Sequence, residues 1–262
     1  MPRRTRLDAE LVRRGLARSR EHAARLIADG LVTVRGSVAA KPATAVETGA
    51  AVVVREQAGE DWASRGAHKL IGALVAFGIE VDGRRALDAG ASTGGFTDVL
   101  LRRGAREVVA ADVGRGLLVW RLRTDERVRV LDKTNARALT PELTGGRVDL
   151  VVADLSFISL RLVLPALLAC ATEDADLLPM VKPQFEVGKE RVGAGGVVRD
   201  PALRADAVIG VAEAAAALGL GVAGVTRSPL PGPSGNVEFF LWLRRDAPAV
   251  DHEAVREVAH EP

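Results

Sequence analysis

From Arg85 onward, apolar strand-like runs alternate with stretches of helical spacing. The runs RALDAG, REVVAADV, VRVLD, RVDLVVADL and DADLLPMV are separated by such stretches or by turns. Parallel strands need crossover connections, which are usually helices, so this alternation predicts a mostly parallel, doubly wound α/β sheet. Two later runs, GVAGVTRS and VEFFLWLRR, predict two more strands and bring the expected sheet to seven.

A glycine-rich turn, ALDAGASTGGF, follows the first of these strands. In doubly wound sheets, ligands bind beyond the carboxyl ends of the strands at the switch point, which is expected after this strand. The glycines let the backbone turn sharply and approach a ligand, and the next helix presents free N–H groups. A plain tight turn is the alternative. The expected cofactor-binding residues of this segment are Asp88, Gly90, Ser92, Thr93, Gly94, Gly95 and Phe96.

The turn restricts which cofactor can bind. It lacks both the G-x-G-x-x-G of dinucleotide sites and the Lys-Ser or Lys-Thr of phosphate-binding loops, so NAD and ATP fit poorly. Asp112 ends the second strand, 22 residues after Gly90, where a carboxylate can bind both ribose hydroxyls of an adenosine. Asp88 is placed to meet an ammonium. These features match S-adenosylmethionine; Asp132 or Asn135 could bind its adenine edge, with a surface-loop role as the alternative.

Four short segments each place one charged residue beside an apolar run. They are RGAHKL at Lys69, VVADLSF at Asp154, MVKPQFE at Lys182 and GNVEFF at Glu238. Charged side chains are costly to bury unless they pair with one another. The four residues therefore predict either structural ion pairs or a catalytic constellation that converges in one site.

The acceptor of a methyl group can be narrowed by elimination. Transfer to an exocyclic base nitrogen commonly uses an (Asn/Asp)-Pro-Pro-aromatic sequence, and the corresponding place reads Asp154-Leu-Ser-Phe157. Transfer to a pyrimidine carbon usually needs a cysteine, and the single Cys170 lies in a core-like helical run. A hydroxyl acceptor remains. Desolvation beside other cations can make a lysine a base, so we expect Lys182 next to a ribose 2′-OH, oriented by Asp154.

Lys69 and Glu238 would then complete a charge-balanced network that positions the ribose. Phe157 either stacks on a base or the adenine, or packs in the core. Lys189 and Arg191, beside a Gly-rich stretch, either reach an RNA backbone or belong to a surface loop.

Basic residues concentrate at the N-terminus. Residues 1–41 carry a net charge of +6, whereas the remaining 221 residues carry −4. Such a basic patch is typical of nucleic-acid binding, because phosphate contacts release counterions, although a solvated helix face is the alternative. The pattern predicts two short helices, with Ser19 capping the second, then a hairpin turning at residues 35–37 and one further strand in VETGAAVVVRE.

This N-terminal stretch resembles the alpha-L RNA-binding motif of a ribosomal small-subunit protein and several RNA-modifying enzymes. The matching segments are RLDAELVRRGLARSREHAARLIADGLVTVRG and KPATAVETGAAVVV. The resemblance implies binding to structured RNA through shape and phosphate contacts. The candidate RNA-binding residues are Arg4, Arg6, Arg14, Arg18, Arg20, Lys41 and Lys189.

The order of the four charged residues resembles the Lys-Asp-Lys-Glu tetrad of ribose methyltransferases related to the heat-shock rRNA methyltransferase. The whole chain is similar to the hemolysin A family of rRNA cytidine-2′-O-methyltransferases, through SRGAHKL, LDAGASTGGFTD, ADLSFISL, VKPQFEVGKE and SPLPGPSGNVEFF. The resemblance implies methylation of cytidine 2′-OH in 16S and 23S rRNA, with ribosomal subunits as substrates and a monomeric enzyme.

The predicted organisation is thus a small α+β RNA-binding domain at 1–58, a polar linker at 59–64 and a Rossmann-like methyltransferase domain at 65–262. One cysteine excludes an internal disulfide and fits a reducing cytoplasm, and four scattered histidines fit no familiar zinc spacing. No metal is expected.

Two alternatives remain open. The family name suggests a membrane-lytic function. Only residues 207–225 are apolar enough to insert into a membrane, and Glu213 and four glycines interrupt them. That stretch reads better as a helix from Asp200 to about Leu218, followed by a strand. The other alternative is a silent RNA-binding scaffold, which would not require two buried lysines.

Overall fold

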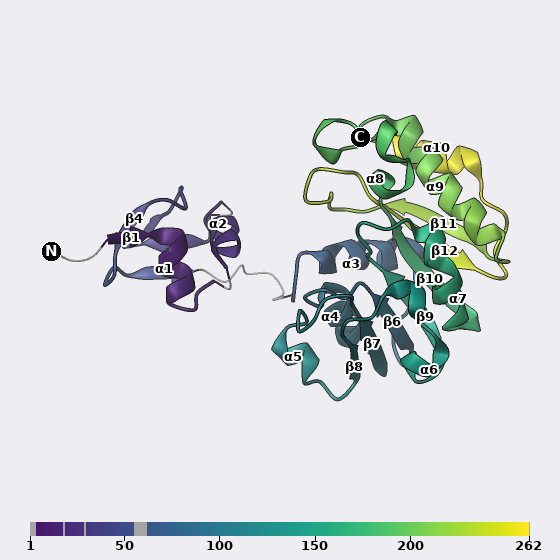
Figure 1. Ribbon diagram of the computed structural model, residues 1–262, viewed down its shortest axis with the longest axis horizontal. Coiled ribbons are helices and arrows are strands. Elements are labelled where there is room, and N and C mark those ends of the chain that lie inside the picture. Colours follow the sequence, from purple (N-terminus) through teal and green to yellow (C-terminus); the bar gives the residue numbers. More distant parts are fainter. Residues whose placement is uncertain (1–3, 18, 29, 55–61, 262) are drawn as a thin grey trace. The chain divides into compact units, whose positions relative to one another are not determined.

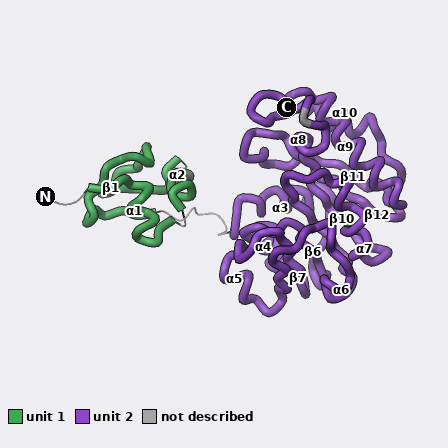
Figure 2. The backbone as a smooth tube through the Cα atoms, in the orientation of Figure 1, with its two compact units in different colours: residues 1–61 green, residues 62–262 purple. Residues whose placement is uncertain are grey.

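The computed structural model divides the chain into two compact units, residues 1–61 and 62–262 (Figure 2). It describes residues 4–17, 19–28, 30–54 and 62–261. Residues 59–61 of the predicted linker at 59–64 therefore lie outside the described residues. Each unit has its own apolar core, and they are described separately below.

Unit 1 contains two short helices and two small sheets. Its elements are β1 Arg4–Arg6, α1 Leu7–Arg13, α2 Arg20–Ala28, β2 Val32–Val34, β3 Ser37–Val38, β4 Ala45–Glu47 and β5 Val52–Val54. The hydroxyl of Ser19 accepts a hydrogen bond from the His22 amide at 3.1 Å and caps α2, as predicted. The predicted hairpin is also confirmed, since β2 pairs with β3 across a turn at Arg35 and Gly36.

One prediction for unit 1 is wrong in detail. The single strand expected in VETGAAVVVRE is two strands, because the chain turns at residues 48–50 and changes partner. The first, β4, pairs antiparallel with β1, and the second, β5, pairs antiparallel with β2. Leu7, Leu11 and Ile27 from the helices and Val32 from β2 form the core between them.

Unit 2 is built on the seven-stranded, mostly parallel sheet that the sequence predicts (Figure 1). Its order is β11-β12-β10-β9-β6-β7-β8, in which β12 pairs antiparallel with both β10 and β11 and the other pairings are parallel. The strands are β6 Arg85–Ala89, β7 Glu107–Ala111, β8 Val128–Leu131, β9 Val148–Ala153, β10 Ala171–Val181, β11 Gly221–Arg227 and β12 Phe239–Arg244. The central strands are mostly apolar and almost entirely buried, as expected for a sheet covered on both faces, although β6 also contains Arg85 and Asp88 and β9 contains the half-buried Asp149.

Helices cover both faces of this sheet, and each face has a separate apolar cluster. The α-helices are α3 Gly66–Phe77, α4 Gly95–Arg102, α5 Trp120–Arg123, α6 Pro141–Thr144, α7 Leu164–Ala169, α8 Pro183–Glu186, α9 Pro201–Ala216 and α10 His252–His260. The 3₁₀ turns are η1 Ala136–Ala138, η2 Leu160–Leu162, η3 Lys189–Arg191 and η4 Ala194–Gly196. Cys170 ends α7 and is fully buried in one of these clusters.

The most apolar stretch of the chain is part of this fold. Asp200 caps α9 by accepting a hydrogen bond from the Ala202 amide, and the helix ends before Gly219, which has a φ of +81°. The chain then enters β11, as predicted. Across the described ranges, no helix combines the length and apolar character needed to cross a membrane.

The strand order places the switch point between β6 and its neighbour β9. The chain runs from β6 to β7 and β8 on one side, and then crosses to β9 and β10 on the other. The loops after β6 and β9 therefore diverge from adjacent strands and leave a crevice at the carboxyl edge of the sheet. The predicted site residues Asp88, Asp154 and Lys182 all lie at this edge.

Candidate active site

The turn after β6 needs glycine for two reasons. Gly90 has a φ of +90°, and a Cβ atom on it would lie 2.5 Å from the backbone oxygen of Asp154. Gly94 has a φ of +102°, and a Cβ there would meet the side chains of Leu122 and Leu118 at 2.4 and 2.7 Å. Even Ser92 adopts a left-handed φ of +48°. This close approach of the β6 and β9 loops shapes the floor of a cavity.

The cavity at this edge has a volume of about 450 Å³. Asp112, directly after β7, lines it and is held in place by two backbone amides: Ser92 N–H donates to Oδ2 at 2.8 Å and Gly114 N–H donates to Oδ1 at 2.7 Å. A carboxylate has about four lone-pair sites, so both oxygens can still accept from ribose hydroxyls. The predicted residues that line the cavity are Gly90, Ser92, Asp112, Asn135, Asp154 and Phe157.

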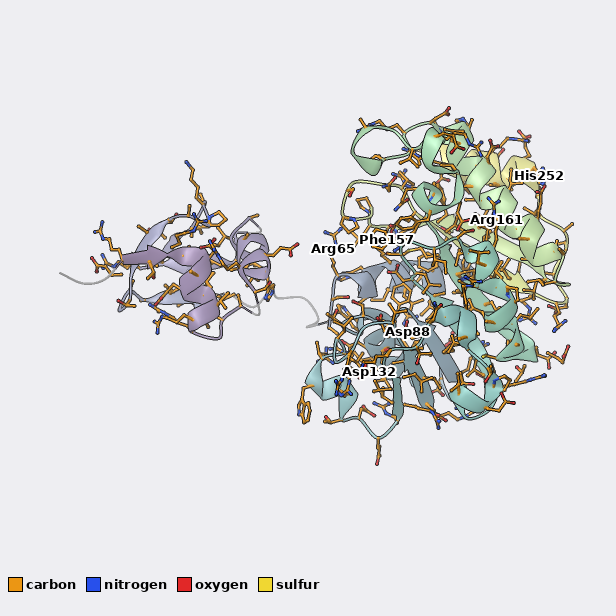
Figure 3. The ribbon with its side chains drawn as sticks, viewed as in Figure 1. Arg65, Asp88, Asp132, Phe157, Arg161 and His252 are labelled. Atoms are coloured by element: carbon orange, nitrogen blue, oxygen red, sulfur yellow. The ribbon has the colours of Figure 1, made fainter. Side chains whose placement is uncertain are left out.

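Asp88 is fully buried at the end of β6 (labelled in Figure 3). The Thr97 hydroxyl donates to its Oδ2 at 2.7 Å, but Oδ1 has no hydrogen-bond partner among the described residues. Burial, together with the nearby charges of Asp154 and Asp112, raises the pKa of Asp88 from 3.8 to about 7. An orphaned carboxylate oxygen of this kind fits a ligand that carries an ammonium group.

The remaining predicted cofactor residues have different surroundings. Asp132, labelled in Figure 3, is bound by the Gly116 amide and by Arg123 at 2.8 Å, whereas Asn135 lines the cavity and its Oδ1 accepts from the Arg137 amide at 3.0 Å. Phe96 is buried against Phe240, with ring centroids 6.1 Å apart, and belongs to the core. Thr93 accepts a hydrogen bond from the Val119 amide through its backbone oxygen. Gly95 lets α3 approach α4, since a Cβ on it would lie 2.2 Å from the Ser64 hydroxyl.

The four charged residues form two ion pairs. Lys182 Nζ lies 2.6 Å from Asp154 Oδ1, and Lys69 Nζ lies 2.5 Å from Glu238 Oε2. Both lysines are buried, with side-chain exposures of 9% and 8%. Lys182 also donates to the Ser156 hydroxyl at 2.9 Å.

Strand register brings the two pairs to the same edge of the sheet. Lys182 follows β10 and Glu238 precedes β12, and the last residue of β10 lies opposite the first residue of β12. Lys182 and Glu238 are thus across from each other, with Asp154 at the end of the adjacent strand β9. Glu238 Oε1 finds no partner among the described side chains, so this network has an open acceptor.

A further carboxylate, which the sequence did not single out, holds the loop after β9. Glu186 in α8 accepts from the Ser159 hydroxyl at 2.6 Å and from the Leu160 amide at 2.7 Å. Burial raises its pKa. Its link to Ser159 supports a segment in which Phe157 has a strained φ of +64° and is 91% exposed. The only feature of the sequence that points to Glu186 is its position in VKPQFE, four residues after Lys182.

The basic residues of unit 1 are organised in pairs by buried carboxylates. Asp8 binds Arg6 and Arg20, both at least half exposed, at 2.9 and 3.0 Å, and the hydrogen bond from Arg6 is the main reason its pKa falls to about 2. Arg14 is different, because besides Glu10 it binds the backbone oxygens of Thr48 and Ala50 and ties α1 to the turn before β5.

The other predicted RNA contacts are less informative. Arg4 lies 3.7 Å from Glu47 and is 69% exposed, and Lys41 is exposed. Arg18 and the side chain of Lys189 lie outside the described residues. Within the described ranges, no group of three histidine, cysteine or acidic residues could hold a metal ion.

The seven-stranded sheet, the glycine turn and a carboxylate-lined cavity at the switch point define an S-adenosylmethionine-dependent methyltransferase. Residues 62–245 match the family of FtsJ-like methyltransferases, and residues 5–52 match the S4 domain. The 16S/23S rRNA (cytidine-2′-O)-methyltransferase TlyA of Mycobacterium tuberculosis is 67% identical over 93% of this chain and 91% of its own length. The chain belongs to this hemolysin A (TlyA) family of rRNA (cytidine-2′-O)-methyltransferases.

More distant relatives match along most of their length. The Bacillus subtilis rRNA methyltransferase homologue YqxC is 42% identical over 92% of this chain and 86% of its own, and hemolysin A of Brachyspira hyodysenteriae is 36% identical over 89% and 97%. A solved structure described as a hemolysin from Streptococcus thermophilus superposes with a TM-score of 0.78 at 38% identity, covering 99% of this chain and 95% of that one. The family and fold predictions are confirmed.

Proposed function

We propose that this protein methylates the ribose 2′-OH of cytidine in 16S and 23S rRNA, within ribosomal subunits. The observation that carries the proposal is the buried ion pair between Lys182 and Asp154, which lies beside the cofactor cavity. A lysine and a carboxylate held together at this edge are suited to a hydroxyl acceptor. The activity named for the Mycobacterium relative agrees with this chemistry.

S-adenosylmethionine supplies an electrophilic methyl group when it is bound. We assign its ribose to Asp112, which lines the cavity, and its ammonium to the unpartnered oxygen of Asp88, which is buried at the end of the adjacent strand. Asn135 would contact the adenine, and the Gly90 turn would let the ligand approach the backbone closely.

Lys182 is the group proposed to accept the 2′-OH proton, in its neutral amine form, as the oxygen attacks the methyl group. A ribose hydroxyl is a weak acid, so a base must take up its proton as the oxygen attacks the methyl group. Asp154 and Ser156 fix the direction of the Lys182 amine through contacts of 2.6 and 2.9 Å. Lys69 and Glu238 would position the acceptor ribose, for which Glu238 Oε1 is an available acceptor.

Unit 1 is proposed to deliver the methyltransferase unit to structured rRNA. Arg6 and Arg20 share the buried Asp8 and present their remaining N–H groups on the surface, where they can contact phosphates. Arg4 and Lys41 would add to this basic surface. We further propose a monomeric protein that acts in the cytoplasm, where ribosomal subunits are found.

The two alternatives have less support. A membrane-lytic role would need α9 to be released, but its Ala205, Val208, Val211 and Ala212 are buried in the core against the sheet. A silent scaffold gives no reason for two buried lysines or for the orphaned oxygen of Asp88.

The test is to incubate the protein with methyl-labelled S-adenosylmethionine and separated small and large subunits that lack the modification. Nuclease digestion and mass spectrometry then locate the label. The proposal requires label on cytidine ribose in both subunits. Label on a base would refute the hydroxyl chemistry, and binding of S-adenosylmethionine without transfer to either subunit would refute the proposed substrate.

A further inference from the structure

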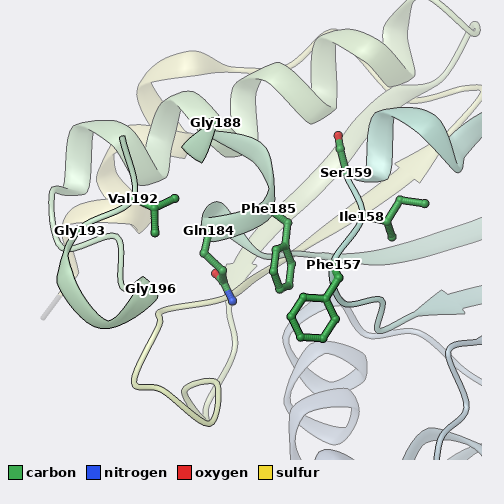
Figure 4. Close-up of a pocket in the computed structure, with 9 residues that line it drawn as sticks. All are labelled: Phe157, Ile158, Ser159, Gln184, Phe185, Gly188, Val192, Gly193 and Gly196. Carbon is green, nitrogen blue, oxygen red and sulfur yellow. The ribbon is translucent and has the colours of Figure 1, made fainter. Parts of the chain in front are cut away.

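A second cavity of about 690 Å³ lies next to the cofactor cavity, on the α8 side (Figure 4). The two cavities share Phe157 and Ile158 as lining residues, so they are neighbours at the loop after β9. Its other walls come from α8 and from the glycine-rich segment at 188–196. Lys182 immediately precedes α8, two residues before Gln184 of this cavity.

Two aromatic rings form one wall of this cavity. Phe157 and Phe185 lie next to each other (Figure 4), with ring centroids 5.3 Å apart and ring planes tilted by 51°. Phe157 is 91% exposed, which is unusual for a large apolar side chain with a strained backbone. Exposed rings beside a nucleic-acid site commonly stack on an unpaired base. The wall therefore fits the base of a nucleotide whose ribose lies at Lys182.

One polar group in the cavity lacks a partner. The side-chain oxygen Oε1 of Gln184 is shielded from solvent and accepts no hydrogen bond from any described residue. Gln184 extends from α8 into the same space as the two rings (Figure 4). A shielded amide oxygen without a donor is costly, so it is suited to receive an N–H from a ligand.

Resting on the function proposed above, we infer that Gln184 recognises the acceptor base by accepting a hydrogen bond from the exocyclic amino group of cytosine. Cytosine presents an N–H donor at this position, whereas uracil presents a carbonyl oxygen. In the orientation seen in the structure, the free oxygen of Gln184 favours cytidine, whereas uridine would require the amide to turn and present its N–H₂ group. The ring wall supplies stacking that does not depend on base identity, and Gln184 supplies the discrimination.

The experiment measures kcat/KM for ribose methylation on two subunit substrates, one with the native target cytidine and one with uridine at that position. We expect wild-type protein to prefer cytidine by at least about tenfold, as lost hydrogen bonds at a polar site usually cost this much or more. Gln184→Leu should lower kcat/KM for the cytidine substrate by about 10- to 100-fold and leave kcat/KM for the uridine substrate within about threefold of wild type. The preference for cytidine over uridine should therefore become smaller.

Two further variants serve as controls. Gln184→Glu keeps an acceptor oxygen and should keep the preference for cytidine. Val192→Ala changes the volume of the same cavity without removing a polar group, so it should leave the ratio unchanged. Binding of S-adenosylmethionine by each variant shows that the cofactor site is intact.

The outcomes separate this inference from the proposed function. If wild-type protein methylates cytidine ribose and Gln184→Leu keeps the wild-type preference, the inference is wrong and the proposed function stands. If Gln184→Leu and Gln184→Glu lose the preference for cytidine equally, the inference is also wrong, because an acceptor oxygen at this position would then make no difference. If wild-type protein labels no ribose on either substrate, the proposed function fails.

Discussion

Asp88 should make the affinity for S-adenosylmethionine depend on pH. The protein without ligand buries this carboxyl completely, and its pKa is raised to about 7. Binding the ligand ammonium requires the ionised form. With a pKa near 7, about one tenth of the protein is ionised at pH 6 and about nine tenths at pH 8. The dissociation constant should therefore be larger at pH 6 than at pH 8, by up to about tenfold, since an α-amino group also loses part of its charge near pH 8.

Asp88 also makes the stability of the unliganded protein depend on pH, but here a higher pH lowers stability, whereas it raises the affinity for S-adenosylmethionine. Because the pKa of Asp88 is higher in the folded state than its ordinary 3.8, the folded state binds the proton more tightly. Stability falls as the pH rises from about 4 to about 7, by at most roughly 4 kcal/mol. Asp88→Asn removes this dependence, so the unliganded variant should unfold at a higher temperature than wild type at pH 8.

Calorimetric titrations at pH 6, 7 and 8 test the effect on binding. Asp88→Asn should bind more weakly at pH 8 and show a flat profile between pH 6 and 8. S-adenosylhomocysteine carries the same ammonium and should repeat the wild-type profile, whereas 5′-methylthioadenosine lacks the amino-acid part and should show no dependence. Equal wild-type affinities at pH 6 and 8, or a pH dependence that survives in Asp88→Asn, would refute the reasoning.

Three other changes probe the two units. Gly90→Ala should weaken S-adenosylmethionine binding at least tenfold in equilibrium dialysis, because its Cβ would lie 2.5 Å from the Asp154 oxygen; Gly83→Ala has a similar φ but open space and should bind normally. Glu186→Ala leaves the Leu160 amide unpaired, so thermal unfolding should shift down by several degrees, as expected for roughly 1–3 kcal/mol, and an unchanged midpoint would argue against the tether. Arg20→Ala should weaken subunit binding and reduce its salt dependence by about one phosphate contact, with only a small loss of stability because Arg6 still pairs with the buried Asp8; an unaltered salt slope would exclude that contact.

Much of the fold could be predicted because its signals are local. Each central strand is an apolar run, and the ALDAGASTGGF turn between strand and helix marks the switch point. The unpredicted elements lack such signals. β1 and β4 are three residues long and are defined by pairing across about 40 residues of sequence. The C-terminal helix α10 follows the last strand, and no helix was predicted there from the sequence.

For the candidate site, residues at strand ends could be identified, but contacts between loops could not. Parallel strands bring their carboxyl ends to one edge, which is why Asp88, Asp154 and Lys182 could be grouped from the sequence. The roles assigned to them remain predictions. The tether from Glu186 to Ser159 joins residues 27 apart, and no local pattern indicates it. Phe96 looked like part of the cofactor turn, but the first turn of α4 directs it into the core.

The measurement that tests the account most directly is the single-turnover rate of methyl transfer by Lys182→Ala at saturating S-adenosylmethionine and ribosomal subunit. The account predicts a rate reduced by about 100-fold or more, the range for loss of a group that moves a proton. It also predicts an unchanged affinity for S-adenosylmethionine, since Lys182 contacts Asp154 and Ser156 and is not assigned to the cofactor. A folded variant that transfers methyl within threefold of the wild-type rate would contradict the claim that this ion pair performs the reaction.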